Sequence, residues 1–154
     1  MIVHFICRGN AFRSLIAEAY LNSLGLEGVE TISSGTVANE YREANRVNFA
    51  KTQALLRKHG IEGWAKTHYA DQLTSARLHQ ADVAVFVNRI ALDEARRLGE
   101  LPGNTIVWDV ADLGEAGRIP SSEEQREAFS EDVYAEIVKE VDALVETLNL
   151  QIKA

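Results

Sequence analysis

Short β-branched runs alternate with longer helical patterns along the whole chain. The runs expected to form strands are 1–7, 28–36, 82–87 and 104–108, and those expected to form helices are 14–25, 39–60, 74–81, 91–99 and 121–150. Strands separated by helices are joined by right-handed crossovers into a parallel sheet. The alternation therefore predicts an α/β fold, with a four-stranded parallel doubly wound sheet and helices on both of its faces.

The last helical pattern has a well-marked start and one apolar face. Ser121, followed three residues later by Glu124, forms a capping box. Apolar residues recur at spacings of four or three, which places one side of this helix against the sheet; they are Phe129, Val133, Ile137, Val141, Leu144 and Leu148. No linker or repeat interrupts the pattern, so residues 1–154 are expected to form a single domain.

Composition limits the partners and the compartment. A net charge of −7 gives no overall basic field to attract nucleic acid or an anionic membrane. The apolar run at 83–87 is much shorter than a membrane-spanning helix requires. The lone cysteine, Cys7, cannot form an internal disulfide, and the first residues lack the features of a signal peptide. We therefore expect a cytoplasmic protein with no nucleic-acid or membrane partner, in which a local site holds any anionic substrate.

Two loops lie where doubly wound sheets bind their ligands, beyond the carboxyl ends of the strands. They are the loop after the first strand, 7–13, and the loop after the last strand, 109–118. The first begins with Cys7, and a thiol reacts as a thiolate, which cations and a helix N-terminus favour. Arg8 and Arg13 supply that positive charge. Cys7 can therefore be a nucleophile, although a cysteine at a strand end can equally be a small core side chain.

The residues after Cys7 favour the nucleophile. Gly9 and Asn10 tolerate positive φ, which lets successive N–H groups turn inward as an anion nest for a tetrahedral oxyanion. Arg13 offers a planar fork to two oxygens of that anion, and the hydroxyl of Ser14 is placed to stabilise the thiolate. A cysteine that only filled space in the core would not require the glycine, asparagine, arginine and serine that follow it. A Walker-type nucleotide loop fits less well, because no Gly-Lys-Ser/Thr follows.

The stretch VHFICRGNAFRSLIAEAY resembles the N-terminal signature of the low-molecular-weight protein tyrosine phosphatase family, whose loop reads Cys-x-Gly-Asn-x-x-Arg-Ser. SSGT at 33–36, HYADQL at 68–73 and the run ADVAVFV are similar to further segments of that family. The resemblance implies a phosphatase-I-like three-layer sandwich. It also implies a loop that holds the phosphate through Arg8, Gly9, Asn10, Ala11, Phe12, Arg13 and Ser14.

The resemblance also implies a reaction in two steps that needs no metal and no cofactor. Cys7 attacks phosphorus to form a cysteinyl-phosphate, Arg13 binds the equatorial oxygens, and water completes hydrolysis. An aspartate of an Asp-Pro pair after the last strand protonates the leaving oxygen in the family. Asp109 and Asp112 are both available here, and we prefer Asp112 on spacing, although Leu113 stands where proline is expected. The expected partner is a phosphorylated protein or a small phosphomonoester.

The sequence departs from the family at positions that concern the substrate. Leu113 and Gly114 stand where many relatives have aromatic residues that flank the phosphotyrosine ring; Phe12 and Tyr41 are possible replacement walls, or merely packing residues. Arg8 occupies a commonly apolar loop position, where it either adds affinity for anions or extends into solvent.

Three other functions compete with the phosphatase. An arsenate reductase of the same fold would need an external small thiol, because this sequence has no second cysteine. A phosphate-binding or phosphoprotein-binding module without catalysis would keep the loop and need no acid. A phosphocysteine carrier of a sugar transport system also has a cysteine after its first strand, but lacks the arginine six positions later. By resemblance, His68 is expected to support the loop, whereas His4 on its strand is expected to be a satisfied structural residue.

Overall fold

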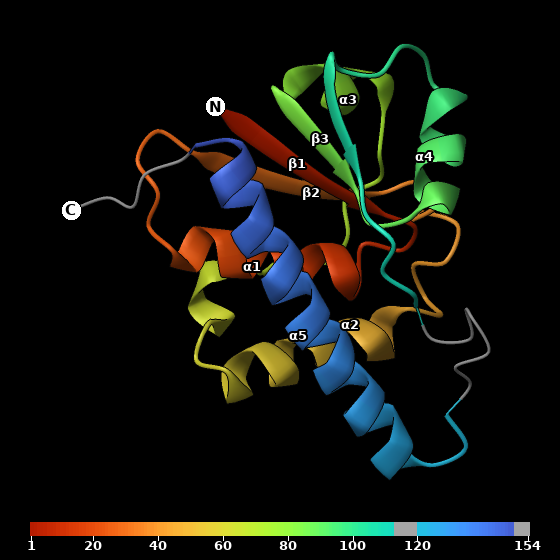
Figure 1. The fold of residues 1–154 in the computed structure, drawn as a ribbon. Coiled ribbons are helices and arrows are strands. Elements are labelled where there is room, and N and C mark those ends of the chain that lie inside the picture. Colours follow the sequence, from red (N-terminus) through yellow and green to blue (C-terminus); the bar gives the residue numbers. More distant parts are fainter. Residues whose placement is uncertain (113–119, 150–154) are drawn as a thin grey trace.

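Four parallel strands form the sheet of this computed structural model, which describes residues 1–112 and 120–149. The strands are β1 (Ile2–Cys7), β2 (Glu30–Gly35), β3 (Val83–Phe86) and β4 (Asn104–Val107), in the spatial order β2-β1-β3-β4. The register places Cys7, at the carboxyl end of β1, opposite Gly35 of β2. Because β1 is central, the residues that follow it emerge in the middle of one edge of the sheet (Figure 1).

Helices cover both faces of the sheet, which confirms the predicted fold. The helices are α1 (Arg13–Ser23), α2 (Arg46–Lys58), α3 (Ser75–Gln80), α4 (Arg89–Arg96) and α5 (Glu123–Thr147), with a short 3₁₀ turn, η1 (Glu62–Trp64), after α2. α1 and α5 pack on one face, and α3 and α4 pack on the other (Figure 1). α2 lies at the end of α1 near the carboxyl edge of the sheet, where Phe49 packs against Ala11 and Leu15.

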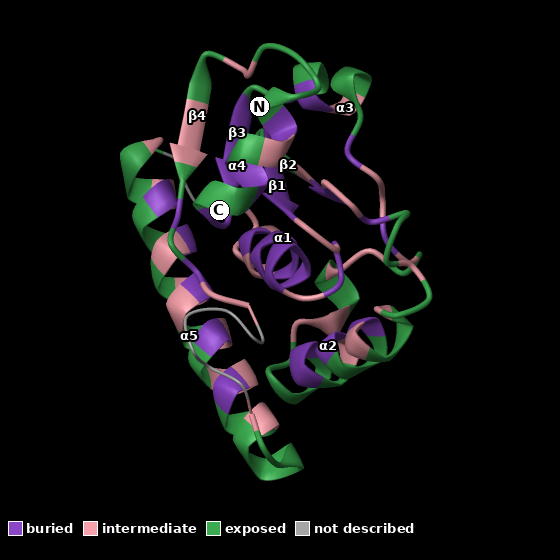
Figure 2. Cartoon of the chain, turned by 90° about the vertical axis from the view of Figure 1, so that its right-hand side faces the viewer, coloured by how far each residue is buried: buried purple, intermediate pink, exposed green. Residues whose placement is uncertain are grey.

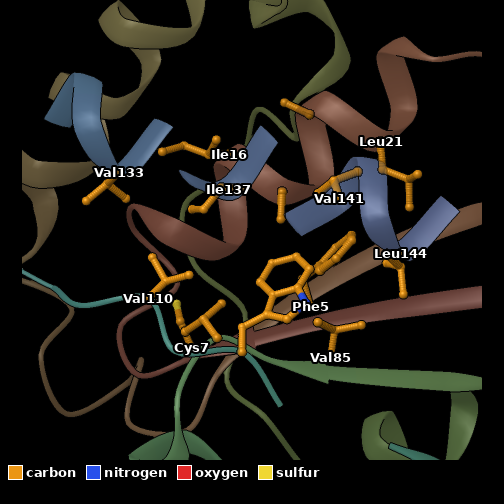
Figure 3. Close-up of a cluster of buried hydrophobic side chains, with 14 of the residues drawn as sticks. Phe5, Cys7, Ile16, Leu21, Val85, Val110, Val133, Ile137, Val141 and Leu144 are labelled. Atoms are coloured by element: carbon orange, nitrogen blue, oxygen red, sulfur yellow. The ribbon is translucent and has the colours of Figure 1, made fainter. Parts of the chain in front are cut away.

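Side chains that alternate along β1 divide the core into two layers. Phe5 and Cys7 point toward α1 and α5, whereas Ile6 points toward α3 and α4. Five of the six apolar residues expected on the inner face of α5 are buried, namely Phe129, Val133, Ile137, Val141 and Leu144 (Figures 2 and 3). The sixth, Leu148, is partly buried against the same cluster. The predicted apolar face of α5 is thus confirmed.

The structure corrects the start of α2. The helix was expected from residue 39, but it begins at Arg46, and residues 36–45 form turns. Tertiary contacts hold this segment in another path: the guanidinium of Arg42 donates to the carbonyls of Tyr69 and Ala70, and the amide of Asn39 donates to the side chain of Gln72. A regular helix over residues 39–45 would leave these polar groups facing solvent. The tertiary contacts therefore outweigh the helical pattern of the sequence in this segment.

The capping box of α5 is also corrected, by one residue. Ser122, not Ser121, is the N-cap, and its hydroxyl accepts from the backbone N–H of Gln125 at 3.2 Å. The side-chain oxygen of Gln125 accepts from both the backbone N–H and the hydroxyl of Ser121, each at 2.8 Å. Glu124 is exposed and takes no part in the cap. In the part of the chain that is described, no helix is long and apolar enough to cross a membrane.

Candidate active site

A pocket of about 290 Å³ opens at the carboxyl edge of the sheet, directly above the end of β1. Its floor is the loop between β1 and α1, which contributes Cys7, Arg8, Gly9, Ala11, Phe12 and Arg13. The segment before α2, α2 itself, the first turns of α5 and Asp112 supply the walls. The loop after β1, helix α2 and the segment after β4 therefore line one pocket. This is the position that the rule for doubly wound sheets predicts for a ligand site.

Cys7 lies at the bottom of this pocket with hydrogen-bond donors around its sulfur. The backbone N–H of Asn10 points at Sγ from 3.1 Å, and the hydroxyl oxygen of Ser14 lies 3.0 Å from Sγ. The Ser14 hydroxyl already accepts from the side chain of Asn10 at 2.8 Å, so its hydrogen is available to the sulfur. Hydrogen bonds from these two groups stabilise negative charge on Sγ.

Asn10 determines the shape of the loop. It adopts the left-handed conformation, with φ of 55°, and is completely buried. Its amide nitrogen donates to the hydroxyls of Ser14 and Ser33, and its amide oxygen accepts from the backbone N–H of Asp71 and from the ammonium of Lys66. Asparagine tolerates this conformation better than most residues, and a buried amide must be satisfied. The side chain of Asn10 therefore fixes the turn that brings its own backbone N–H to the sulfur of Cys7.

Gly35 lets β2 approach the loop closely. A Cβ at this position would lie 2.5 Å from the carbonyl oxygen of Arg8, 2.8 Å from the backbone nitrogen of Asn10 and 2.9 Å from the carbonyl carbon of Gly9. All three atoms belong to the backbone, which cannot swing aside as a side chain can. The glycine of SSGT is thus required by contact with the loop.

Lys66 supports the loop from behind and was missed in the sequence analysis. It is nearly buried, and its ammonium contacts the amide oxygen of Asn10, the carbonyl of Ser33 at 3.1 Å and the carboxylate of Asp71 at 2.9 Å. His68, which was expected to support the loop, is 63% exposed, and its Nε2 lies 2.7 Å from Oδ2 of Asp71, the same oxygen that Lys66 contacts. Burial opposes ionisation of Asp71, but the hydrogen bonds from His68 and Lys66 outweigh it and lower the pKa of that carboxyl.

A buried acid ends the hydrogen-bond chain that starts at the sulfur. The chain runs from Cys7 through Ser14, Asn10 and Ser33 to Glu18, whose carboxylate accepts from the Ser33 hydroxyl at 2.5 Å. Glu18 belongs to the Ala-Glu pair of α1 and is almost fully buried. Burial raises the pKa of Glu18, and the hydrogen bond from Ser33 only partly offsets that effect. The loop is thus tied to the interior by polar contacts at every step.

Arg13 connects the loop to the segment after β4. Its side chain is 1% exposed, and one guanidinium nitrogen donates to the carbonyl of Val110 at 2.8 Å. The other terminal nitrogen lies 3.4 Å from the carboxylate of Asp112. Asp112 is 39% exposed and lines the pocket, whereas Asp109 is exposed and is absent from the lining formed by the described residues. Cys7, Arg13 and Asp112 thus share one pocket.

Arg8 forms an ion pair that the sequence analysis did not predict. Its guanidinium forms a two-point ion pair with Glu94 of α4, with nitrogen–oxygen distances of 2.9 and 3.4 Å. The hydroxyl of Thr36 donates to the same carboxylate at 3.0 Å. Because Glu94 neutralises much of its charge, Arg8 joins the loop to α4 while it lines the pocket.

Two aromatic residues, Phe12 and Tyr41, are among those that line the pocket, and Phe12 also packs against the core cluster of α1 and α5. Phe12 stands at the N-cap of α1, and Tyr41, which is 42% exposed, comes from the segment before α2. Leu113 and Gly114, where relatives have aromatic residues, lie outside the described residues. Within the ranges 1–112 and 120–149, no three acidic, histidine or cysteine side chains are grouped as metal ligands.

His4 lies on the opposite side of β1 from Cys7 and is completely buried. Its Nε2 lies 2.8 Å from the hydroxyl of Ser34, but its Nδ1 has no hydrogen-bond partner among the described residues, so it is less well satisfied than expected. Burial, reinforced by the positive charges of Arg77 and Lys66, lowers the pKa of His4 to about 3.

The sequence model of the family described as low molecular weight phosphotyrosine protein phosphatase matches residues 2–154. Wzb from Vibrio vulnificus, solved in complex with benzylphosphonate, is 21% identical and has a TM-score of 0.75, over 95% of this chain and 97% of that one. A Drosophila arginine phosphatase is 19% identical with a TM-score of 0.72, over 96% and 98%. A thioredoxin-dependent arsenate reductase from Corynebacterium glutamicum is 20% identical with a TM-score of 0.65, over 96% and 61%. At these identities the likeness shows a shared fold. No curated protein matches the sequence.

Proposed function

The chain belongs to the low molecular weight phosphotyrosine protein phosphatase family, a family of cysteine-based hydrolases, and from this premise we propose that it hydrolyses phosphomonoesters through a cysteinyl-phosphate on Cys7. One observation carries the proposal: the sulfur of Cys7 lies at the bottom of a pocket that Arg13 and Asp112 also line. Phosphoryl transfer through a covalent enzyme intermediate requires a nucleophile, a cation that binds the phosphate at two points and a carboxyl group that moves a proton. This pocket brings all three together.

In the first step the thiolate of Cys7 attacks phosphorus in line with the leaving oxygen. The sulfur–phosphorus bond forms as the phosphorus–oxygen bond breaks, and the carboxyl of Asp112 gives its proton to the leaving oxygen. The guanidinium of Arg13 and the loop N–H groups hold the three equatorial oxygens. Arg13 is well prepared for this role, because its contact with the carbonyl of Val110 already fixes the plane of its fork.

In the second step water attacks the phosphorus of the cysteinyl-phosphate. The carboxylate of Asp112 takes a proton from that water, the sulfur–phosphorus bond breaks, and inorganic phosphate and the Cys7 thiolate are released. The Ser14 hydroxyl, 3.0 Å from Sγ, and the N–H of Asn10, 3.1 Å from it, stabilise the departing thiolate. The cycle balances with water as its only co-reactant.

We propose phosphotyrosine-type esters as substrates, on a protein or on a small molecule. The aromatic rings of Phe12 and Tyr41 line the pocket, whose volume of about 290 Å³ suits one aryl phosphate rather than a folded surface. A nucleophilic thiol works only while it stays reduced, so we place the activity in the reducing cytoplasm.

The test is hydrolysis of an aryl phosphate from pH 4.5 to 8 with EDTA present. The native protein should turn over, Cys7→Ser should lose turnover, and Arg13→Lys should lose most of it despite its retained charge, because a bidentate fork is lost. Intact-protein mass spectrometry after an acid quench should find one added phosphoryl group on native protein and none on Cys7→Ser. Turnover that survives in Cys7→Ser would refute the mechanism. No turnover in either protein, with arsenate reduced when a small thiol is added, would assign the chain to arsenate reduction instead.

A further inference from the structure

The lining of the pocket continues past the loop to a second group of polar side chains, which come from α2 and α5. α2 contributes Asn48 and Lys51 to this end of the pocket, and α5 contributes Arg126 and Ser130. The proposed reaction at Cys7 needs none of these residues. Their presence therefore raises the question of what the far end of the pocket binds.

The cations that line the pocket differ in their partners. Arg8 is neutralised by Glu94, and Arg13 contacts the Val110 carbonyl and Asp112. Lys51 forms a loose pair with the exposed Glu123, with an ammonium–carboxylate distance of 3.3 Å. Arg126 is half-buried, yet no group in the described parts of the chain forms a hydrogen bond or an ion pair with its guanidinium.

Arg126 is a half-buried residue whose guanidinium has no partner in the described ranges 1–112 and 120–149, so it is suited to an anion that arrives with the ligand. The group carries five N–H donors in a planar fork, which fits a carboxylate or a phosphate at two points. The neighbouring Ser130 hydroxyl donates to the backbone carbonyl of Arg126 at 2.9 Å, and this bond does not involve the guanidinium. The chain has a net charge of −7, which repels anions overall. A local cation in the pocket offsets this repulsion and allows a second anionic group of the ligand to bind.

We propose that the end of the pocket between α2 and α5 is a second anion site, in which Arg126, assisted by Lys51, binds an acidic group of the phosphomonoester substrate. This inference rests on the proposed function, because the phosphate itself must lie at Cys7. The substrate class is a phosphomonoester with a second acid, either a carboxylate on the same small molecule or an acidic residue that flanks a phosphorylated side chain.

The test is the selectivity between substrates that differ in that acid alone. The value of kcat/KM is measured for the 3- and 4-carboxyphenyl phosphates and for the matching neutral carboxamides. The ratio of acid to amide is then compared between the native protein and Arg126→Gln, so that intrinsic leaving-group effects cancel. We expect the ratio to fall about tenfold in Arg126→Gln, the size of a hydrogen-bonded charge contact, and to recover in part in Arg126→Lys. High salt should lower the native ratio.

Lys139→Gln is the matched control, because Lys139 is an exposed cation further along α5 and outside the pocket. It removes the same charge and should leave the ratio unchanged. Far-UV circular dichroism and thermal unfolding establish that each variant is folded. An equal fall in Lys139→Gln would assign the effect to net charge and overturn the proposal, as would an unchanged ratio in Arg126→Gln.

A binding measurement separates failure of this site from failure of the proposed function. Calorimetry compares 4-carboxybenzylphosphonate with its carboxamide, neither of which can be hydrolysed. Binding of both with equal affinity, in native protein and in Arg126→Gln alike, would refute the second site and leave the phosphatase intact. Binding of neither would overturn both proposals. Phosphotyrosine peptides with glutamate or glutamine beside the phosphorylated residue identify the source of the acid: a gain that depends on Arg126 in this pair assigns it to a flanking residue.

Discussion

Gly35→Ala is the sharpest test of how the loop is held. Gly35 does not adopt positive φ, so the substitution adds no backbone strain of its own. Its methyl group would instead lie 2.5 Å from the carbonyl oxygen of Arg8 and 2.8 Å from the backbone nitrogen of Asn10. Contacts below 3.0 Å essentially never occur at a real Cβ, so the loop, β2 or both must move.

The expected loss follows from which atoms must move. Arg8 and Asn10 belong to the loop whose N–H groups would hold the phosphate, so a shift of several tenths of an ångström misaims them. Relaxing a 2.5 Å contact to an ordinary one of 3.4 Å requires a movement that approaches 1 Å. Misplacement of a catalytic group by about 1 Å costs about 100-fold in rate, and we expect kcat/KM of Gly35→Ala to fall by about that factor. Overpacking at the end of β2 should also lower stability by about 1–3 kcal/mol.

The assay is aryl phosphate hydrolysis, measured well below the midpoint of thermal unfolding of each variant. Gly63→Ala in η1 is the control, because a Cβ at Gly63 meets nothing within 4 Å and this glycine also lacks positive φ. That variant should keep native activity and native stability. If Gly35→Ala is folded and its kcat/KM remains within about threefold of native, close contact with the loop does not matter and our reasoning is wrong.

Three further outcomes are expected. Asp112→Asn should lower kcat about 100-fold for an ester with a poor leaving group, whereas Asp109→Asn should change it little; the reverse result would identify Asp109 as the acid. Lys66→Met should lower both kcat and the thermal midpoint, because Asn10 loses a buried charged donor, with partial rescue in Lys66→Arg; native kinetics in Lys66→Met would show that the loop needs no such support. His4→Gln should remove part of the acid sensitivity of folding: burial lowers the pKa of His4 from 6.5 to about 3, so between these values the unfolded chain binds a proton that the folded chain excludes, and stability falls by about 1.4 kcal/mol per pH unit on acidification. Equal slopes in urea titrations of native protein and variant would contradict this.

The sequence determined those features that depend on neighbours along the chain. The alternation of runs predicted the parallel sheet and its two helical layers, because periodicity reports burial locally. The loop from Cys7 to Ser14 was recognisable for the same reason, since its nucleophile, its residues that tolerate positive φ and its arginine are adjacent. The inner face of α5 was likewise readable from spacing alone.

Tertiary structure decided everything that joins distant segments. Lys66 reaches Asn10 across 56 residues, and no local pattern marks it as a support of the loop. The clash behind Gly35 exists only because β2 runs beside β1 in this register. The start of α2 moved to Arg46 because contacts of the preceding segment outweighed helix propensity, which is only a weak preference. Arg126 became a candidate ligand residue only when α5 was packed beside α2, since the charges around a side chain depend on the packed neighbours and not on the residues before and after it.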